Sequence, residues 1–213
     1  MLLTSIEVLA VISSAVYGVL LARRTGMDFV GVFSVAFIIA FGGGTLRDLF
    51  LDRTPLFWIA QPHYPVIVFA LAVGLSLIRY SPRLIERLLP IPDALGLGLF
   101  SVVGAAYALE MPGMSWFNAS LLGVVTGTFG GVIGDVVCNR VPSLFRPSTP
   151  LYATASFAGS WAYILLTEAG AVEGVAVAAG IAVVVVARLA ALKWGIRLPD
   201  LSHGVADNSG PPD

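Results

Sequence analysis

An internal duplication constrains this chain more than any other feature of its 213 residues. A shift of 87 positions, the separation of Asp48 and Asp135, aligns FGGGTLRD at 41–48 with TFGGVIGD at 128–135 without a gap. Other identical residues share this register: Ser14 with Ser101, Gly26 with Gly113, Met27 with Met114, Gly43 with Gly130, Gly44 with Gly131, and Arg53 with Arg140. The sequence therefore predicts two related halves, each with a glycine motif that is followed by an aspartate.

The composition predicts that both halves lie in a membrane. Hydrophobic residues make up 57% of the chain and charged residues 12%, and the mean hydropathy is +0.90. This leaves too little polar surface to cover a water-soluble protein of the same length. The net charge of -1 argues against nucleic acid as a partner, since binding its phosphates requires an excess of clustered Lys and Arg.

Seven apolar runs predict an all-α integral membrane protein with seven transmembrane helices, because about 20 apolar residues cross a bilayer as a helix. The runs cover residues 2–22, 29–49, 65–80, 91–109, 116–138, 151–167 and 172–192. A short amphipathic segment with Arg83, Glu86 and Arg87 precedes the fourth run. Five aromatic residues are expected to anchor the membrane interfaces: Trp58, Tyr64, Tyr80, Trp116 and Trp194.

The duplication divides these spans into two repeats of three helices, at residues 1–85 and 86–170. A seventh helix at 171–197 and a disordered tail at 198–213 follow. Because each repeat has an odd number of helices, the second repeat starts from the opposite side of the membrane. The two repeats are therefore expected to be inverted, with the second and fifth helices antiparallel.

The distribution of basic residues predicts the orientation. Ten of the twelve Lys and Arg fall on the side of the C-terminus, and only Arg47 and Arg53 fall on the other side. Basic residues close to membrane spans are retained in the cytoplasm. The N-terminus is therefore expected outside, and the C-terminus with its tail in the cytoplasm.

The glycine motifs of the second and fifth helices supply the first candidate site residues. This set comprises Gly42, Gly43, Gly44 and Thr45 in the first motif, and Thr128, Gly130 and Gly131 in the second. Each glycine lowers helix stability by about 1 kcal/mol relative to alanine and allows a bend or an unwound turn. Carbonyl groups freed inside a membrane need partners, so such breaks tend to line a permeation path or a binding site. Alternatively, the glycines only allow two helices to approach closely.

Charged residues beside the glycines form the second candidate set. Asp48 and Asp135 are expected near the mouths of a path, where acids concentrate cations, and Arg47 paired with an acid is expected to form a constriction or gate. The alternative places both aspartates at the membrane surface. Secondary candidates are Ser14, Ser101 and Arg140.

The remaining polar residues indicate neither an enzyme nor a cofactor site. Glu7 and Asp93 lie near helix starts, where the helix dipole favours a carboxylate, so they carry little weight. His63 and His203 are in loops far apart in the sequence, and no metal-ligand spacing, nucleophile with a base, or phosphate loop with a lysine occurs. We expect no enzyme activity and no metal or cofactor beyond permeant ions and bound lipid.

The stretch at 41–48, followed by Pro55, Phe57 and Trp58, resembles the prokaryotic relatives of the trimeric intracellular cation (TRIC) channels, which carry two glycine-transporter-type domains. The resemblance extends over about residues 5 to 195, and its second motif is looser because Phe129 replaces a glycine. It implies a homotrimer in a bacterial or archaeal inner membrane. It also implies that potassium or another monovalent cation passes through a pore in each protomer, between kinked second and fifth helices. Eukaryotic members are described with a basic voltage-sensing residue on the fourth helix, which has no Lys or Arg here.

Three functions remain open from the sequence. The leading hypothesis is a potassium-permeable cation channel. A secondary transporter of a small zwitterion such as glycine is the main alternative, because inverted repeats with broken helices are equally typical of carriers. A scaffold that oligomerises through small-residue faces is the third, and it predicts an interior without a path.

Overall fold

The computed structural model describes residues 2–78, 81–146 and 150–197. The predicted tail at 198–213 and the expected anchor Tyr80 lie outside these residues. Regular structure in the described part of the chain is entirely helical. The elements are α1 (Leu2–Arg24), α2 (Phe29–Phe50), α3 (Phe57–Ala60), α4 (His63–Leu77), α5 (Pro82–Leu88), α6 (Pro90–Leu109), α7 (Trp116–Val137), the 3-10 helix η1 (Ser143–Phe145), α8 (Ala153–Glu168) and α9 (Glu173–Trp194).

The membrane helices follow the predicted apolar runs. Each of the seven runs overlaps one of α1, α2, α4, α6, α7, α8 and α9, and the predicted amphipathic segment forms α5. An all-helical membrane fold is therefore confirmed. Among the described residues, five helical stretches are long and apolar enough to cross a membrane, with Pro82–Leu109 counted as one, whereas α4 is shorter at 15 residues. The count of seven spans stays a prediction.

Local geometry repeats between the two halves. Gly26 and Gly113, which are equivalent in the duplication, both have positive φ, at 75° and 76°. The next helix then begins at a side-chain cap: Asp28 accepts a hydrogen bond from the backbone N–H of Gly31 at 2.9 Å before α2, and Ser115 accepts one from Asn118 at 3.1 Å before α7. The repeated sequence thus encodes the same turn and the same start of a helix twice.

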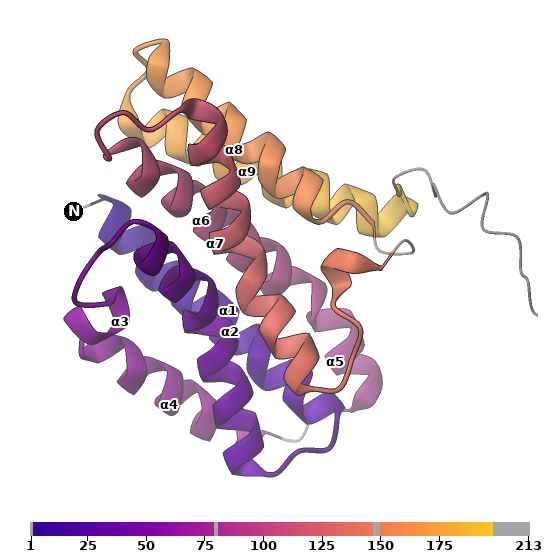
Figure 1. Cartoon of the computed structure of the whole chain (residues 1–213). Helices are drawn as coiled ribbons and strands as arrows, with labels where there is room; N and C mark the ends of the chain where they lie inside the picture. Colours follow the sequence, from indigo (N-terminus) through magenta and orange to yellow (C-terminus); the bar gives the residue numbers. More distant parts are fainter. Residues whose placement is uncertain (1, 79–80, 147–149, 198–213) are drawn as a thin grey trace, which may run out of the picture.

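The two groups of three helices meet along two helix pairs. α1 contacts α2 and α4 in the first group, and α6 contacts α7 and α8 in the second. The groups join where α1 contacts α6 and α2 contacts α7 (Figure 1), while α9 lies beside α6 and α8. The domain boundaries at 85, 86 and 170 stay a prediction.

Both glycine motifs lie inside continuous helices. The α2 backbone is helical through Gly42–Gly44, and the α7 backbone through Gly130 and Gly131, so the predicted unwound turn is wrong. Close packing explains these glycines instead. A Cβ atom on Gly43 would overlap the carbonyl oxygen of Thr126 in α7, and one on Gly130 would overlap the carbonyl oxygen of Ile39 in α2. The antiparallel helices approach each other through one glycine from each repeat.

Candidate functional site

A buried ion-pair cluster joins the first repeat at one end of the molecule. The Arg47 side chain is 0% exposed. Its Nη1 donates to Glu7 Oε1 in α1 at 3.0 Å, and its Nε donates to Asp48 Oδ1 at 2.9 Å. The hydroxyl of Tyr64 in α4 donates to Glu7 Oε2 at 3.4 Å. One arginine thus balances two carboxylates that are removed from water.

A second buried cluster lies at the other end. Arg188 of α9 donates from Nη2 to Asp93 Oδ2 at 3.0 Å and from Nε to the same oxygen at 3.3 Å. Its Nη1 donates to the carbonyl oxygen of Pro150 at 2.6 Å. The hydroxyl of Tyr152 donates to Asp93 Oδ1 at 3.4 Å. Asp93 is therefore held by a tyrosine and an arginine, as Glu7 is.

The two clusters are related by the duplication, but their arginines are not. In the register of 87, Glu7 aligns with the neighbour of Asp93, and Tyr64 aligns with the neighbour of Tyr152. Both repeats therefore have a carboxylate and a tyrosine at positions that are equivalent to within one residue. Gly134 occupies the place of Arg47 in α7, so the second arginine comes from α9, outside the repeats.

Asp48 and Asp135 fix the loops that follow their helices. Asp48 Oδ2 accepts a hydrogen bond from the backbone N–H of Phe57 at 2.7 Å, and Asp135 Oδ2 accepts one from that of Ser143 at 2.8 Å. The aspartates are 1% and 2% exposed, so neither is an ordinary surface residue. Arg140 Nη1 lies 3.8 Å from Asp135 Oδ1.

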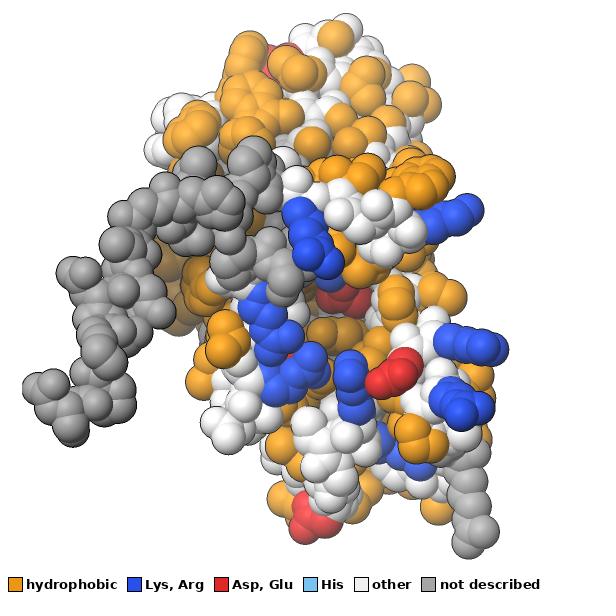
Figure 2. Space-filling model, turned by 90° about the vertical axis from the view of Figure 1, so that its right-hand side faces the viewer, with side chains coloured by type: hydrophobic (Ala, Val, Ile, Leu, Met, Phe, Trp, Pro, Cys, Tyr) orange, Lys and Arg blue, Asp and Glu red, His pale blue; other side chains and the backbone are white. Residues whose placement is uncertain are grey.

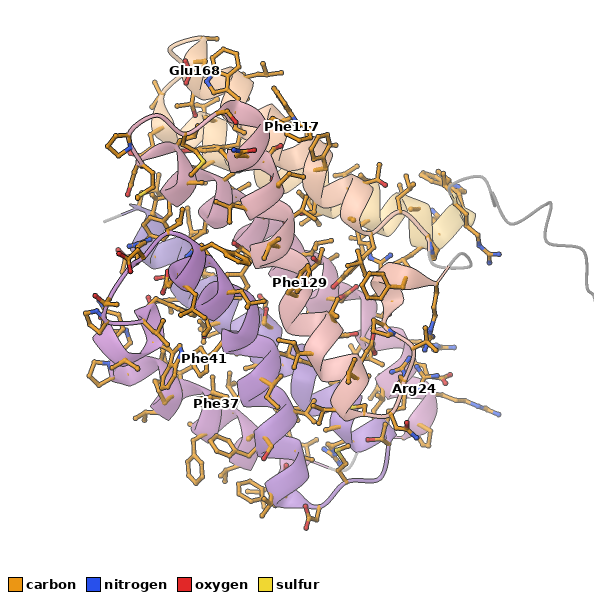
Figure 3. All side chains as sticks on the ribbon, in the orientation of Figure 1. Arg24, Phe37, Phe41, Phe117, Phe129 and Glu168 are labelled. Carbon is orange, nitrogen blue, oxygen red and sulfur yellow. The ribbon has the colours of Figure 1, made fainter. Side chains whose placement is uncertain are left out.

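Aromatic rings fill the space around Arg47. Its guanidinium carbon lies 5.0 Å from the ring centroid of Phe57 and 4.7 Å from that of Tyr107, and the guanidinium carbon of Arg53 lies 3.8 Å from the Tyr107 centroid. Phe41 contacts Phe57 edge to face, and Figure 3 shows Phe41 on the side of α2 toward α3 and α4. This end of the interior is closed by packed side chains.

The end that carries Arg188 is hollow instead. A cavity of about 230 Å³, which we call the basic hollow, is lined by charged residues together with Tyr17, Ser143 and apolar side chains. Its charged lining residues are Arg24, Asp93, Arg140 and Arg188. Figure 2 shows this face of the molecule, with Lys and Arg side chains around a depression that has an acidic side chain within it.

A much smaller cavity adjoins the basic hollow and is lined in part by Ile39 of α2 and Thr126 of α7. Its volume is about 10 Å³, close to the minimum that holds one water molecule. Tyr17 and Asp93 line both spaces, and the small cavity also reaches Ser14, Gly127 and Gly131.

The other predicted site residues are distributed differently. Thr128 donates to its own helix at Val124 O, and Ser101 donates to Leu97 O, as hydroxyls inside helices commonly do. Gly42 and Thr45 line a separate apolar groove of about 310 Å³ with Trp58, whose indole N–H donates to Thr45. Ser14 lines the small cavity whereas Ser101 does not, so these repeat-related serines are not equivalent.

Three residues of the two ion-pair clusters were not predicted as site residues from the sequence. Tyr64 is expected at an interface but is buried at 0% exposure, because its hydroxyl bonds to Glu7. Arg188 is one of two basic residues near the end of an apolar helix, and Tyr152 adjoins a proline-rich loop. The recurrence of a carboxylate and a tyrosine at nearly the same separation was the only available indication. Within the described ranges, no group of three His, Cys, Asp or Glu side chains could hold a metal ion.

Comparison with known proteins identifies the family. The sequence profile described as "Glycine transporter" matches the chain twice, at residues 4–80 and 90–168. The chain belongs to the glycine transporter family. The two matches of the glycine transporter profile coincide with the two groups of three helices.

Relatives and solved structures agree with this assignment. The chain is 38% identical to a UPF0126 membrane protein of Vibrio cholerae over 186 residues, 87% of this chain and 77% of the relative. It is 34% identical to the UPF0126 inner membrane protein YadS of Escherichia coli K12 over 201 residues, 93% of this chain and 96% of the relative. These names and the apolar helices make this glycine transporter family member a multi-pass membrane protein.

The fold is that of a TRIC channel. The structure of the TRIC trimeric intracellular cation channel orthologue from Rhodobacter sphaeroides superimposes with a TM-score of 0.82 at 34% identity, over 92% of this chain and 99% of the other. A second structure, of a TRIC cation channel whose conductance it explains, superimposes with a TM-score of 0.79 at 28% identity, over 94% of this chain and 97% of the other. The resemblance predicted from the glycine motif is confirmed.

Proposed function

We propose that this protein is a channel for monovalent cations, potassium among them, and not an enzyme. One observation carries the proposal: over 92% of its length, the chain shares the fold of a TRIC cation channel orthologue and is 34% identical to it in sequence. The solved structures that it resembles are channels, so the carrier alternative is not favoured.

The path that we propose runs inside each protomer, between α2 and α7. Its inner section is the basic hollow, which leads past Tyr17 and Asp93 into the small cavity beside Gly131. A cavity of about 10 Å³ is too small for a hydrated cation, and the buried Arg47 fills the section beyond it. The conformation described here is then a closed one, and Arg47 is its gate.

The assembly and the orientation belong to the same proposal. The relatives of known structure are described as trimeric, which supports a homotrimer in a lipid bilayer. The excess of Arg and Lys at the C-terminal end supports an inner membrane orientation with that end in the cytoplasm. The basic hollow then opens to the cytoplasm, and the Arg47 cluster lies toward the outside.

Reconstitution of the purified protein in a planar bilayer tests the proposal. We expect unitary current steps in KCl. In a KCl gradient, the reversal potential should shift toward the equilibrium potential of potassium. A saturable flux of a zwitterion without unitary steps would establish a carrier instead. Arg47→Gln is expected to raise the open fraction, while Arg83→Gln, an exposed change on α5, serves as the matched control.

A further inference from the structure

The charged residues of this protein are unequally divided between its two ends. Among the described residues, the end with the basic hollow has nine Lys and Arg against four Asp and Glu, and the opposite end has two against six. Figure 3 marks the two ends by Arg24 and Glu168. Retention of basic residues on one side of the membrane explains such a bias at exposed positions.

It does not explain why arginines line the hollow itself. Arg24, Arg140 and Arg188 all border this cavity, and Asp93 is its only acidic lining residue among those described. Arg188 is bound to Asp93, and their charges offset one another. Arg140 keeps a side chain that is 26% exposed and approaches Asp135 only to 3.8 Å, and Arg24 pairs with Glu86 at 3.3 Å on the outer surface.

The opposite end has the reverse balance of charge, with more acidic than basic residues among those described. Arg47 and Arg53 lie there with Glu7 and Asp48, and Glu110 is exposed at the end of α6. Cations that approach this end therefore meet a neutral or acidic surface. Cations that approach the other end must first enter a cavity lined by arginines.

Local charge at a channel mouth sets the local concentration of the permeant ion. A unit charge at about 7 Å changes that concentration by about two- to threefold in a water-like dielectric, and salt at about 0.1 M screens part of the effect. Fewer cations are therefore available at the basic hollow than at the opposite mouth. The effect acts on ions that enter from the hollow, and much less on ions that leave through it.

We propose that the arginines of the basic hollow make the conductance asymmetric, so that cations flow more readily toward the hollow than away from it. This inference rests on the proposed channel function and names Arg140 as its main determinant. Arg140 is a partly exposed arginine of the hollow, and its ion pair with Asp135, at 3.8 Å, is longer than those of Arg24 and Arg188, at 3.3 and 3.0 Å.

Charge labelling of a single cysteine tests the inference. The channel carrying Cys138→Ser and Arg140→Cys is recorded in a planar bilayer with about 0.1 M KCl on both sides. A sulfonate or a trimethylammonium methanethiosulfonate reagent is then added from each side in turn. We expect the anionic label to give about twofold more current than the cationic label when cations enter from the hollow and cross toward the opposite end. The cationic label should restore the asymmetry of the parent channel.

Two further measurements make the result decisive. The same labels on Arg83→Cys, at the same end but outside the hollow, should change the current ratio much less. The asymmetry of the unmodified channel should also decline between about 0.1 and 1 M KCl, as the screening length falls from about 10 to 3 Å. Equal effects at positions 83 and 140, or an asymmetry that salt does not reduce, would overturn this inference alone. No current in the parent protein would overturn the channel function as well.

Discussion

Removal of the Arg47 side chain is the most informative perturbation of stability. Arg47 lies between Glu7 and Asp48, which are 3% and 1% exposed. Arg47→Met keeps most of the side-chain volume but leaves two buried carboxylates without a cation. Breaking a buried pair by removing one partner costs about 3–5 kcal/mol, and two carboxylates depend on this arginine. We therefore expect the free energy of unfolding to fall by at least about 3 kcal/mol.

The double variant Glu7→Gln with Arg47→Met separates charge from shape. Glutamine at position 7 removes one orphaned charge and still accepts from Tyr64, so part of the loss should be recovered. The unfolding free energy can be measured by denaturing-detergent titration in mixed micelles, with Cys138 labelling as the report of unfolding. The electrostatic argument would be refuted if Arg47→Met changed stability by less than about 1 kcal/mol, or if the two substitutions were additive.

Three other expectations follow from the packing. Gly43→Ala should destabilise the protein by about 1–3 kcal/mol, whereas Gly74→Ala, with no atom near its added Cβ, should be neutral or slightly stabilising in the same titration. Cys138 is only 7% exposed, so maleimide reaches its thiol poorly in the folded protein. Labelling should therefore be slow before unfolding and accelerate on unfolding, and rapid labelling of the folded protein would contradict this. Asp135→Ala should remove the acceptor of the Ser143 N–H and cost about 1–3 kcal/mol, visible as faster amide exchange in the loop after α7, while unchanged exchange would show that the carboxylate does not hold the loop.

The membrane fold was predictable because its causes are local. About 20 consecutive apolar residues can be counted along the chain, and the turns at Gly26 and Gly113 follow from the residue types at those positions. The pairing of Arg47 with an acid was likewise predictable, since a charged residue at this depth needs a partner. The count of seven spans, the domain boundaries and the roles of the site residues stay predictions.

The role of the glycines was not predictable, because it depends on what faces them. A run of glycines permits a bend and permits close approach, and the carbonyl oxygens of Thr126 and Ile39 opposite Gly43 and Gly130 show the close approach. Helix propensity is then overridden by packing against a neighbour that is more than 80 residues away in the chain.

The sequence by itself determined that this protein is a duplicated, all-helical membrane protein whose two glycine motifs oppose each other. Only the tertiary structure decided that one arginine comes from α2 and the other from α9, and that one end of the interior is closed while the other is hollow. The physical reason is that hydrophobic periodicity and span length are properties of neighbouring residues. The partner of a buried charge is set by the three-dimensional packing of helices that are distant in the chain.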